Sequence, residues 1–216
     1  MPQNSHKMIK IKIKGEQNMS LTAAQLAGSN SINGRVKDDY YATPFVATEM
    51  ILDALDLGDD SILEPSAGEG HIVKVLKERY PRNEIVANDL VDRHSRLGIE
   101  INSGIDFLSY EPNRKFGTII TNPPFKFAQR FVEHALEIAD HYVIMFCKIQ
   151  FLETVERQQL FTEHPPRYVY VHSRRVSPWV NGDELNASGK PWASPMCFAW
   201  YVWEIGYTGE TIVRWL

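Results

Sequence analysis

Cysteine is nearly absent from this chain. The 216 residues include two cysteines, Cys147 and Cys197, and apolar residues surround both of them. Neither belongs to a CxxC motif or to a cysteine–histidine pair at zinc-binding spacing, which excludes a disulfide scaffold and a structural zinc finger. We therefore predict two reduced, packed thiols in a cytoplasmic protein that holds no metal.

Long apolar runs and an excess of positive charge are also missing. The longest apolar stretch, residues 142–147 (YVIMFC), has the length of a buried strand and falls far short of the roughly 18 residues of a membrane helix. The opening residues, MPQNSHKMIKIKIKG, contain no apolar core of a secretory signal, so we expect no membrane association. The net charge of −4 excludes a globally basic protein, and any nucleic-acid contact must come from a local patch.

The composition that remains is that of a folded domain. Hydrophobic residues make up 44% of the chain and charged residues 23%, and its length equals about 1.4 average domains. We predict a partly flexible N-terminal arm over residues 1–39 and a single domain over residues 40–216. Within the arm, the alternation of residues 7–14 (KMIKIKIK) predicts an edge strand, with a basic arm that touches phosphates as the alternative. Residues 15–36 are predicted to form a loop.

Strand and helix patterns alternate from residue 40 onward. The predicted strands are residues 61–63, 84–88, part of 99–108, 116–121, 142–148, 167–171 and 198–205. The predicted helices are residues 44–57, with Thr43 as the cap, 71–80, 92–97, 126–139 and 153–161. This order predicts an α/β fold in which helices cover both faces of a mostly parallel, seven-stranded sheet. Only a loop joins the last two strands, which predicts a C-terminal antiparallel hairpin.

Two of the predicted strand ends carry residues suited to ligand binding. Residues 63–70 (LEPSAGEG) contain two glycines that allow a tight turn before a helix. Glu64 and Glu69 place negative charge where a diphosphate would need donors, so this turn favours a ligand with a cationic portion. Asp89 follows at the end of the next strand, where an acidic residue suits ribose hydroxyls. A helix-capping role for Asp89 is the alternative.

A third strand end has the sequence Asn122-Pro123-Pro124-Phe125. The two prolines fix the backbone and remove two N–H donors, which leaves carbonyl oxygens and the Asn122 amide as acceptors. Phe125 adds an aromatic face beside them. This combination predicts a site that accepts hydrogen bonds from an amino group on a flat ring and stacks on that ring.

Together these motifs resemble a known enzyme family. Tyr41-Ala-Thr-Pro44, Glu64–Gly70, Asp89, Asp106-Phe107-Leu108 and Asn122–Phe125 occur in the order found in the gamma group of S-adenosylmethionine-dependent amino-methyltransferases of DNA adenine. The resemblance covers about residues 40–150, and the aromatic tail is similar to small phage or prophage-borne methyltransferases. It implies a Rossmann-like class I methyltransferase fold, S-adenosyl-L-methionine as cofactor and the exocyclic amino group of adenine as acceptor.

The resemblance also implies a role for each motif residue. Thr43 would contact the methionine end of the cofactor, Glu64 its amino group, Asp89 the ribose hydroxyls and Asp106 the adenine amino group, with Phe107 along the adenine ring. The implied cofactor-binding set is Tyr41, Thr43, Glu64, Ala67, Gly68, Gly70, Asp89, Asp106 and Phe107. The implied catalytic set is Asn122, Pro123, Pro124 and Phe125. Because the target base cannot be reached inside a duplex, it must be flipped out or already single-stranded.

The chain departs from sequence-reading adenine methyltransferases because it has no sizeable recognition domain. The candidate for contacting the target is therefore the loop of residues 172–196, through Arg174, Arg175 and Trp179. An equally weighted alternative is that this segment is only a solvated hairpin loop. The partner predicted for this loop is nucleic acid, foremost DNA. Three other functions stay open: methylation of RNA adenine, methylation of a protein glutamine, and binding without catalysis.

Other polar and aromatic residues receive structural interpretations. The histidines at positions 71, 94, 134, 141 and 164 show no triad or metal spacing, so we expect them at the surface or at helix caps. Trp200, Tyr201 and Trp203 are expected in the core or on the faces of the sheet.

Overall fold

A computed structural model describes residues 40–216 of the chain, and the strand and loop predicted within the N-terminal arm lie outside these residues. The described helices are α2 (Phe45–Ala54), α3 (His71–Arg79), α4 (Ala128–Ile138) and α5 (Val155–Glu163). Short 3-10 turns occupy Phe107–Ser109, Phe125–Phe127 and Ile149–Leu152. The strands are β1 (Tyr41–Ala42), β2 (Ile62–Glu64), β3 (Ile85–Asp89), β4 (Asn102–Ser103), β5 (Phe116–Thr121), β6 (Ala139–Lys148), β7 (Tyr168–Val171), β8 (Trp179–Val180), β9 (Phe198–Glu204) and β10 (Ile212–Trp215).

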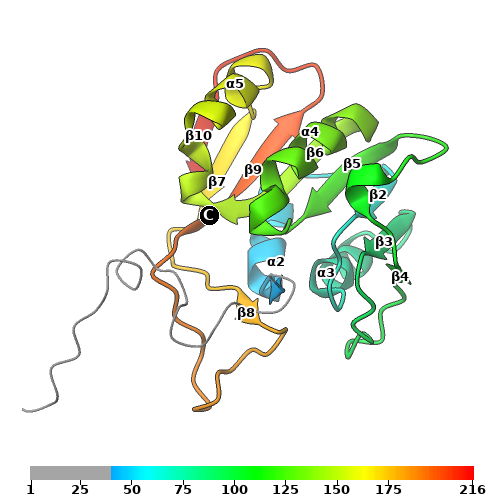
Figure 1. Cartoon of the computed structure of the whole chain (residues 1–216), viewed down its shortest axis with the longest axis vertical. Coiled ribbons are helices and arrows are strands. Elements are labelled where there is room, and N and C mark those ends of the chain that lie inside the picture. Colours follow the sequence, from blue (N-terminus) through cyan, green and yellow to red (C-terminus); the bar gives the residue numbers. More distant parts are fainter. Residues whose placement is uncertain (1–39) are drawn as a thin grey trace, which may run out of the picture. The chain divides into compact units, whose positions relative to one another are not determined.

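The main sheet has the order β10-β7-β9-β6-β5-β2-β3-β4 (Figure 1). Strands β4, β3, β2, β5 and β6 run parallel, whereas β9 is antiparallel to both of its neighbours, β6 and β7. The predicted α/β fold and the C-terminal hairpin are therefore confirmed. The described sheet has one strand more than predicted, because β10 pairs with the outer edge of β7.

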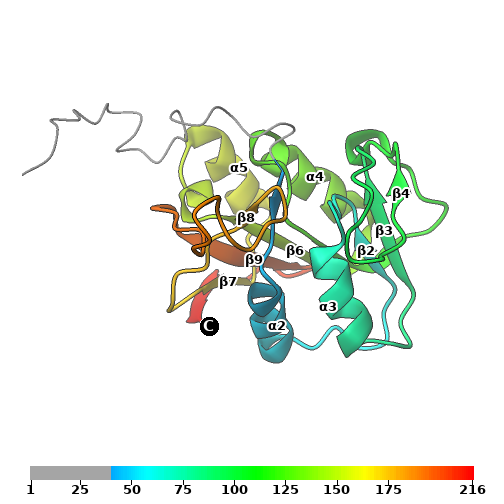
Figure 2. The same cartoon turned by 90° about the horizontal axis from the view of Figure 1, so that it is seen from below.

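Helices cover both faces of this sheet, with α4 and α5 on one side and α2 and α3 on the other (Figure 2). Each side has its own apolar cluster, one packed under α4 and α5 and one under α2 and α3. The predicted core aromatics Trp200, Tyr201 and Trp203 lie on β9 and are at most 1% exposed. Alternation along this strand sends Trp200 to the α2 side and the other two to the α5 side.

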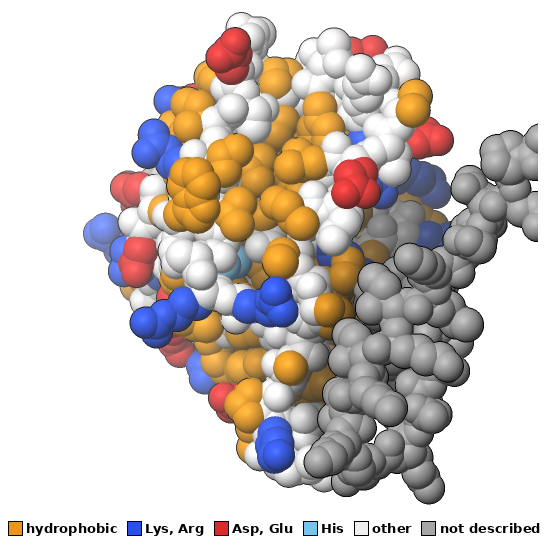
Figure 3. All heavy atoms as spheres, turned by 90° about the vertical axis from the view of Figure 1, so that its left-hand side faces the viewer, with side chains coloured by type: hydrophobic (Ala, Val, Ile, Leu, Met, Phe, Trp, Pro, Cys, Tyr) orange, Lys and Arg blue, Asp and Glu red, His pale blue; other side chains and the backbone are white. Residues whose placement is uncertain are grey.

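Strand β10 forms an edge of the sheet, and its four residues are exposed. The exposed fractions of Ile212, Val213 and Trp215 are 41%, 48% and 70%. A space-filling view of this side of the molecule shows apolar side chains gathered in one continuous group (Figure 3). The sequence prediction missed this strand because its pairing partner, β7, is more than 40 residues away in the chain.

The predicted helix at residues 92–97 is wrong, since this segment is an irregular loop. His94 has a φ of 50°, a left-handed conformation that interrupts an α-helix, and its backbone N–H donates to the Asp92 carboxylate at 3.0 Å. The Ser95 hydroxyl donates to the backbone carbonyl of Glu69. Local and tertiary hydrogen bonds replace the helical ladder here.

Thr43 is not the cap of the first helix. The helix begins at Phe45 with Pro44 at its N-cap, and no side chain caps it. The Thr43 hydroxyl is buried without a hydrogen-bond partner among the described residues. The two cysteines also differ: Cys147 is buried, and burial raises the pKa of its thiol to about 12, whereas Cys197 is exposed and is not packed as predicted.

No helix within residues 40–216 is both long and apolar enough to cross a membrane. Among the same residues, no three histidine, cysteine, aspartate or glutamate side chains gather in a way that could hold a metal ion.

Candidate functional site

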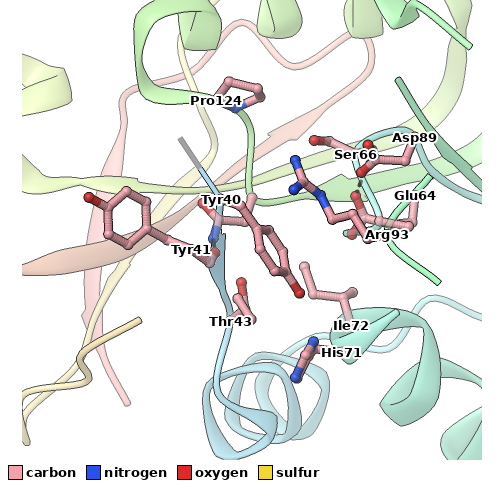
Figure 4. A pocket seen from close by; sticks show the side chains of 13 residues that line it. Tyr40, Tyr41, Thr43, Glu64, Ser66, His71, Ile72, Asp89, Arg93 and Pro124 are labelled. Atoms are coloured by element: carbon pink, nitrogen blue, oxygen red, sulfur yellow. Dashed lines mark hydrogen bonds between the residues drawn. The ribbon is translucent and has the colours of Figure 1, made fainter. Parts of the chain in front are cut away.

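A cavity lies at the carboxyl ends of β2, β3 and β5, where open α/β sheets bind their ligands. Its enclosed volume is about 40 Å³, and residues of the β1 segment form one of its walls. The residues that line it are Tyr40, Tyr41, Ala42, Thr43, Glu64, Ser66, Ala67, His71, Ile72, Asp89, Arg93, Asn122 and Pro124 (Figure 4). The fold thus brings motifs from four separate parts of the chain to one place.

The glycine-containing turn after β2 is built on two left-handed residues. Gly68 has a φ of 61° and Gly70, the N-cap of α3, a φ of 93°. A Cβ on Gly68 would stand 2.4 Å from the Tyr40 ring, and one on Gly70 would stand 2.7 Å from Ile99. Only glycine fits both the conformation and the space, so the turn can lie close to a ligand.

Asp89 ties this turn to the end of β3. One of its carboxylate oxygens accepts the Gly68 backbone N–H at 2.7 Å, and the other accepts the Val91 N–H at 2.8 Å. Asp89 is 5% exposed and lines the cavity.

Glu64 is completely buried at the end of β2. Its Oε1 accepts the Ser66 backbone N–H at 3.0 Å, and its Oε2 has no partner among the described residues. Burial raises the pKa of Glu64 to about 8, although the nearby Thr121 hydroxyl and the Ser66 N–H oppose this rise. The carboxyl group is therefore mostly neutral at pH 7 and would ionise beside a cation.

Glu64 is one of four lining residues that have a buried polar atom without a partner. The others are the Thr43 hydroxyl, Nδ1 of His71 and Nε of Arg93. Buried polar atoms in folded proteins are almost always paired, so their concentration around one cavity indicates a site for a polar ligand. Burial also lowers the pKa of His71, which keeps this imidazole neutral near pH 7.

Arg93 is the one Lys or Arg side chain among the lining residues, and sequence reasoning missed it. Its guanidinium lies 4.3 Å from the centre of the Tyr40 ring, and Figure 4 shows it between Tyr40 and the two carboxylates, Glu64 and Asp89. His71 was expected at the surface or at a helix cap; it is the first residue of α3, is 4% exposed and lines the cavity. Arg93 could have been predicted as a site residue because it lies only four residues after Asp89. No sequence pattern pointed to His71 as a site residue.

Asn122 stands at the mouth of the cavity with its amide orientation fixed. Its Nδ2 donates to the Tyr41 backbone carbonyl at 2.7 Å, which assigns the other amide atom, Oδ1, as the free acceptor. Pro123 is buried and Pro124 lines the cavity. The one side-chain donor at this strand end, Asn122 Nδ2, is therefore already in use, and Oδ1 is the acceptor that remains.

Phe125 lies next to this acceptor pair. Its ring stacks on Tyr41 with a centroid separation of 5.5 Å and an interplanar angle of 27°. Nζ of Lys148, at the end of β6, lies 4.2 Å from the centre of the same ring. The sequence analysis did not predict Lys148 as a site residue, because a lysine at the end of a buried strand is not a recognisable motif.

The remaining predicted residues lie elsewhere. Asp106 is exposed, and its carboxylate caps the 3-10 turn by accepting the Leu108 N–H at 3.0 Å. Phe107 is 2% exposed and packs on Phe131 with a centroid separation of 4.9 Å. Neither belongs to the residues that line the cavity, so the structure does not bring the predicted adenine contacts to it.

The predicted target loop places its three residues differently. Arg174 and Arg175 are exposed, and Arg175 donates to the Ser194 backbone carbonyl at 3.3 Å. Trp179 belongs to β8 and packs edge-on against Phe45 and His71, with centroid separations of 5.4 and 5.6 Å. The Trp179 ring therefore packs behind His71, which lines the cavity, and is not itself a lining residue.

Comparison with known proteins identifies the fold. No family model and no curated protein match the sequence. A Listeria monocytogenes protein assigned to the class I S-adenosylmethionine-dependent methyltransferases is similar in structure, with a TM-score of 0.59 and 12% identity over 89% of this chain and 71% of its own. A modification subunit assigned to a type I restriction enzyme of Vibrio vulnificus has a TM-score of 0.56 and 12% identity over 87% of this chain, which spans only 48% of that subunit.

A third similar structure, from Pyrococcus horikoshii, is assigned as an RNA methyltransferase and has a TM-score of 0.53 and 14% identity over 76% of this chain and 87% of its own. These likenesses define the class of fold: the chain has the Rossmann-like fold of class I methyltransferases.

Proposed function

We propose that this protein binds S-adenosylmethionine in the cavity and transfers its methyl group to the exocyclic amino group of adenine in DNA. The observation that carries the proposal is the orientation of Asn122. Because its Nδ2 is committed to the Tyr41 carbonyl, Oδ1 remains as the hydrogen-bond acceptor of this side chain. The backbone carbonyl of Pro123 provides a second acceptor beside it.

The cavity fits the cofactor through its unpaired polar atoms. Glu64 Oε2 is a buried acceptor that a methionine ammonium would satisfy, and the Thr43 hydroxyl is available to the same end of the molecule. Asp89 would accept the ribose hydroxyls. When bound, S-adenosylmethionine supplies a methyl group on a positively charged sulfur, so the site needs no metal ion and no covalent nucleophile.

The chain's own contribution is to orient a weak nucleophile. The lone pair of an aromatic amine is delocalised into the ring, which makes the nitrogen unreactive. Two hydrogen bonds, donated by the amine to Asn122 Oδ1 and to the Pro123 carbonyl, stabilise a nitrogen whose lone pair points out of the ring plane. Positioning of this kind and fixed dipoles are the main sources of rate enhancement in such a site. The nitrogen–methyl bond forms, the carbon–sulfur bond breaks, and one amine proton passes to solvent.

Two features support a nucleic-acid acceptor. The rings of Phe125 and Tyr41 offer a stacking surface beside the amide, and base–aromatic stacking is a common way to hold an unpaired base. Arg174 and Arg175 are exposed on the neighbouring loop, where they would contact phosphates. A modification subunit and a protein assigned as an RNA methyltransferase are also among the similar structures.

The decisive experiment offers three acceptors in parallel. The full chain is incubated with tritium-labelled S-adenosylmethionine and, separately, with adenine-containing DNA, RNA and a protein lysate. The proposal expects label in DNA that is recovered as N6-methyladenine after digestion. Label in RNA or in protein glutamine instead of DNA would identify that molecule as the acceptor. Absence of label from all three would indicate a protein that binds without catalysing methyl transfer.

Replacing Phe125 with alanine is expected to lower turnover on duplex DNA more than on single-stranded DNA. A base taken from a duplex must be held against restacking, and each stacking contact contributes about 1–3 kcal/mol. The measurement is kcat/KM on matched paired and unpaired oligonucleotides. Phe125→Tyr serves as the control, because it keeps the ring face. Equal losses on both substrates would show that Phe125 does not hold a flipped base.

Removing both Arg174 and Arg175 should weaken DNA binding and reduce its dependence on salt. Two fewer phosphate contacts lower the slope of log affinity against log salt by about 1.8 for duplex DNA. The double alanine variant and the wild type are compared by fluorescence anisotropy across a salt series. Lys77→Ala with Arg79→Ala is a control of equal charge on α3, away from the loop. An unchanged slope would show that these two arginines of the loop do not contact DNA phosphates.

A further inference from the structure

The segment that joins β7 to β9 folds back over the cavity. Its middle part, β8, pairs antiparallel with β1, so that Tyr41 lies opposite Val180 and Ala42 opposite Trp179. The segment therefore pairs with β1, whose residues line the cavity and whose Tyr41 carbonyl accepts the hydrogen bond from the Asn122 amide. The β1–β8 ribbon alone is only two residues long in each strand, so further contacts must fix the position of this segment.

Arg96 supplies those contacts. It belongs to the irregular loop that follows Asp89, and its guanidinium joins three parts of the chain. Its Nε and Nη2 donate to the two carboxylate oxygens of Glu69 at 2.7 and 2.9 Å. Its Nη1 donates to the Asp183 carboxylate at 2.7 Å, and Nη2 also donates to the Asn181 carbonyl at 2.8 Å. We call these four residues the Arg96 clasp.

The clasp leaves no room for a side chain at Gly182. This residue has a φ of 74°, and a Cβ on it would stand 2.7 Å from Arg96 Nη2, 3.0 Å from Glu69 Oε1 and 3.1 Å from the Tyr40 hydroxyl. The same hydroxyl accepts the Glu69 backbone N–H at 3.2 Å. The closeness of Gly182 shows that the loop is fitted to the clasp and does not merely lie near it.

The two halves of the clasp differ in exposure. The Glu69 side chain is 8% exposed, whereas those of Arg96 and Asp183 are each 54% exposed. The Glu69 carboxylate is therefore shielded from water, whereas the Asp183 carboxylate is not. Hydrogen bonds to both carboxylates raise the pKa of Arg96, so its charge does not vary with pH. The inner half can persist while the outer half opens and releases the loop.

We propose that Arg96 is a positioning residue that couples the cofactor site to the target-contacting loop. This inference rests on the proposed function. Glu69 belongs to the turn that would lie against the cofactor, and Arg96 belongs to the loop that follows Asp89, so a bound cofactor orders both partners of the inner pair. An ordered Arg96 then holds Asp183 and Asn181, which places the exposed Arg174–Arg175 pair of the same segment for the target. By reciprocity, a bound target strengthens cofactor binding by the same factor.

Hydrogen exchange of the full chain tests the coupling without any nucleic acid. Addition of S-adenosylhomocysteine, the demethylated cofactor, should slow exchange of backbone amides in residues 177–186 at least about fivefold, the lower end of typical allosteric coupling. Asp183→Ala should reduce this effect to less than about twofold. Glu184→Ala is the matched control, because it removes an adjacent exposed carboxylate that does not belong to the clasp.

Glycine substitutions give an independent test. Gly182→Ala should release the loop as Asp183→Ala does, whereas Gly189→Ala should not. Gly189 lies in the same segment with a φ of 70°, but a Cβ on it meets nothing within 4 Å, so it reproduces the backbone strain without the collision. Equal exchange in both alanine variants would overturn the inference, as would an unchanged response to S-adenosylhomocysteine in Asp183→Ala.

Kinetics separate positioning from a merely structural role. Asp183→Ala should raise the KM for the methyl acceptor at saturating cofactor about fivefold, and by reciprocity the KM for the cofactor at saturating acceptor by a similar factor, while kcat stays within twofold. Glu184→Ala should change none of them. A general loss of stability would instead lower kcat and the melting temperature together. If no acceptor is methylated but the exchange results are as expected, the proposed function fails and the coupling stands. If an acceptor is methylated but Asp183→Ala leaves the exchange response unchanged, only the coupling is overturned.

Discussion

Replacing Asn122 with alanine should reduce methyl transfer by about 100- to 1,000-fold, the usual loss when one preorganised hydrogen-bond group is removed from a reacting centre. The affinity for S-adenosylhomocysteine should change less than threefold. The reason is that Oδ1 of Asn122 would accept a hydrogen bond from the amine of the methyl acceptor, while its Nδ2 is held by the Tyr41 carbonyl. The measurements are single-turnover transfer of a tritiated methyl group and calorimetric titration of the same protein preparations.

A neutral control exists in the same region of sequence. Asn113 is exposed in the loop before β5, and Asn113→Ala should leave both rate and affinity unchanged. If Asn122→Ala retained more than about a tenth of the wild-type rate, the strand-end amide would not be the group that orients the amine. A loss of cofactor affinity equal to the loss of rate would instead assign Asn122 to the cofactor wall.

The affinity for S-adenosylhomocysteine should rise steeply with pH between pH 6 and 7.5. Burial raises the pKa of Glu64 to about 8 in the free protein, so below that pH the carboxyl group is protonated and must lose its proton to pair with the ligand's ammonium group. This linkage predicts a gain in affinity of about 25-fold across the interval and the release of nearly one proton on binding. Burial lowers the pKa of His71, which favours its neutral form and so reduces its contribution to this pH dependence.

Calorimetry in buffers with different ionisation enthalpies measures both quantities. The matched ligand control is 5′-methylthioadenosine, which has the nucleoside but no amino acid portion, and whose affinity should not vary with pH. The matched protein control is Glu64→Gln, which should bind S-adenosylhomocysteine weakly and without pH dependence. A flat affinity profile for the wild type would show that Glu64 does not face the ammonium group.

The same shift has a consequence for the stability of the free protein. A carboxyl group whose folded pKa is raised contributes stability that is complete below its unfolded pKa, about 4.5, and is lost as pH rises through about 8. Glu64→Gln cannot ionise, so it should melt at a higher temperature than the wild type above pH 8. At pH 5 the two proteins should melt at similar temperatures.

The proposed acceptor end of the site could be predicted from the sequence because its residues lie within one short segment. Two prolines remove backbone donors wherever they occur, and a strand that ends at Thr121 must present the following residues at the edge of the sheet. The predicted helix at residues 92–97 failed for the opposite reason. Its residues have helical propensity, but tertiary hydrogen bonds through Ser95 and Arg96 favour an irregular loop.

The sequence by itself determined the α/β fold, since alternating strand and helix patterns bury apolar faces in only one class of layered structure. It also placed Glu64, Asp89 and Asn122 at strand ends. Only the tertiary structure decided that Asp106 and Phe107 lie away from the cavity, that Arg93 and His71 line it, and that Arg96 binds the loop that carries Asp183. Those contacts join residues as far as 87 positions apart, and local patterns carry no information about such distances. They arise from how the loops pack once the sheet has formed.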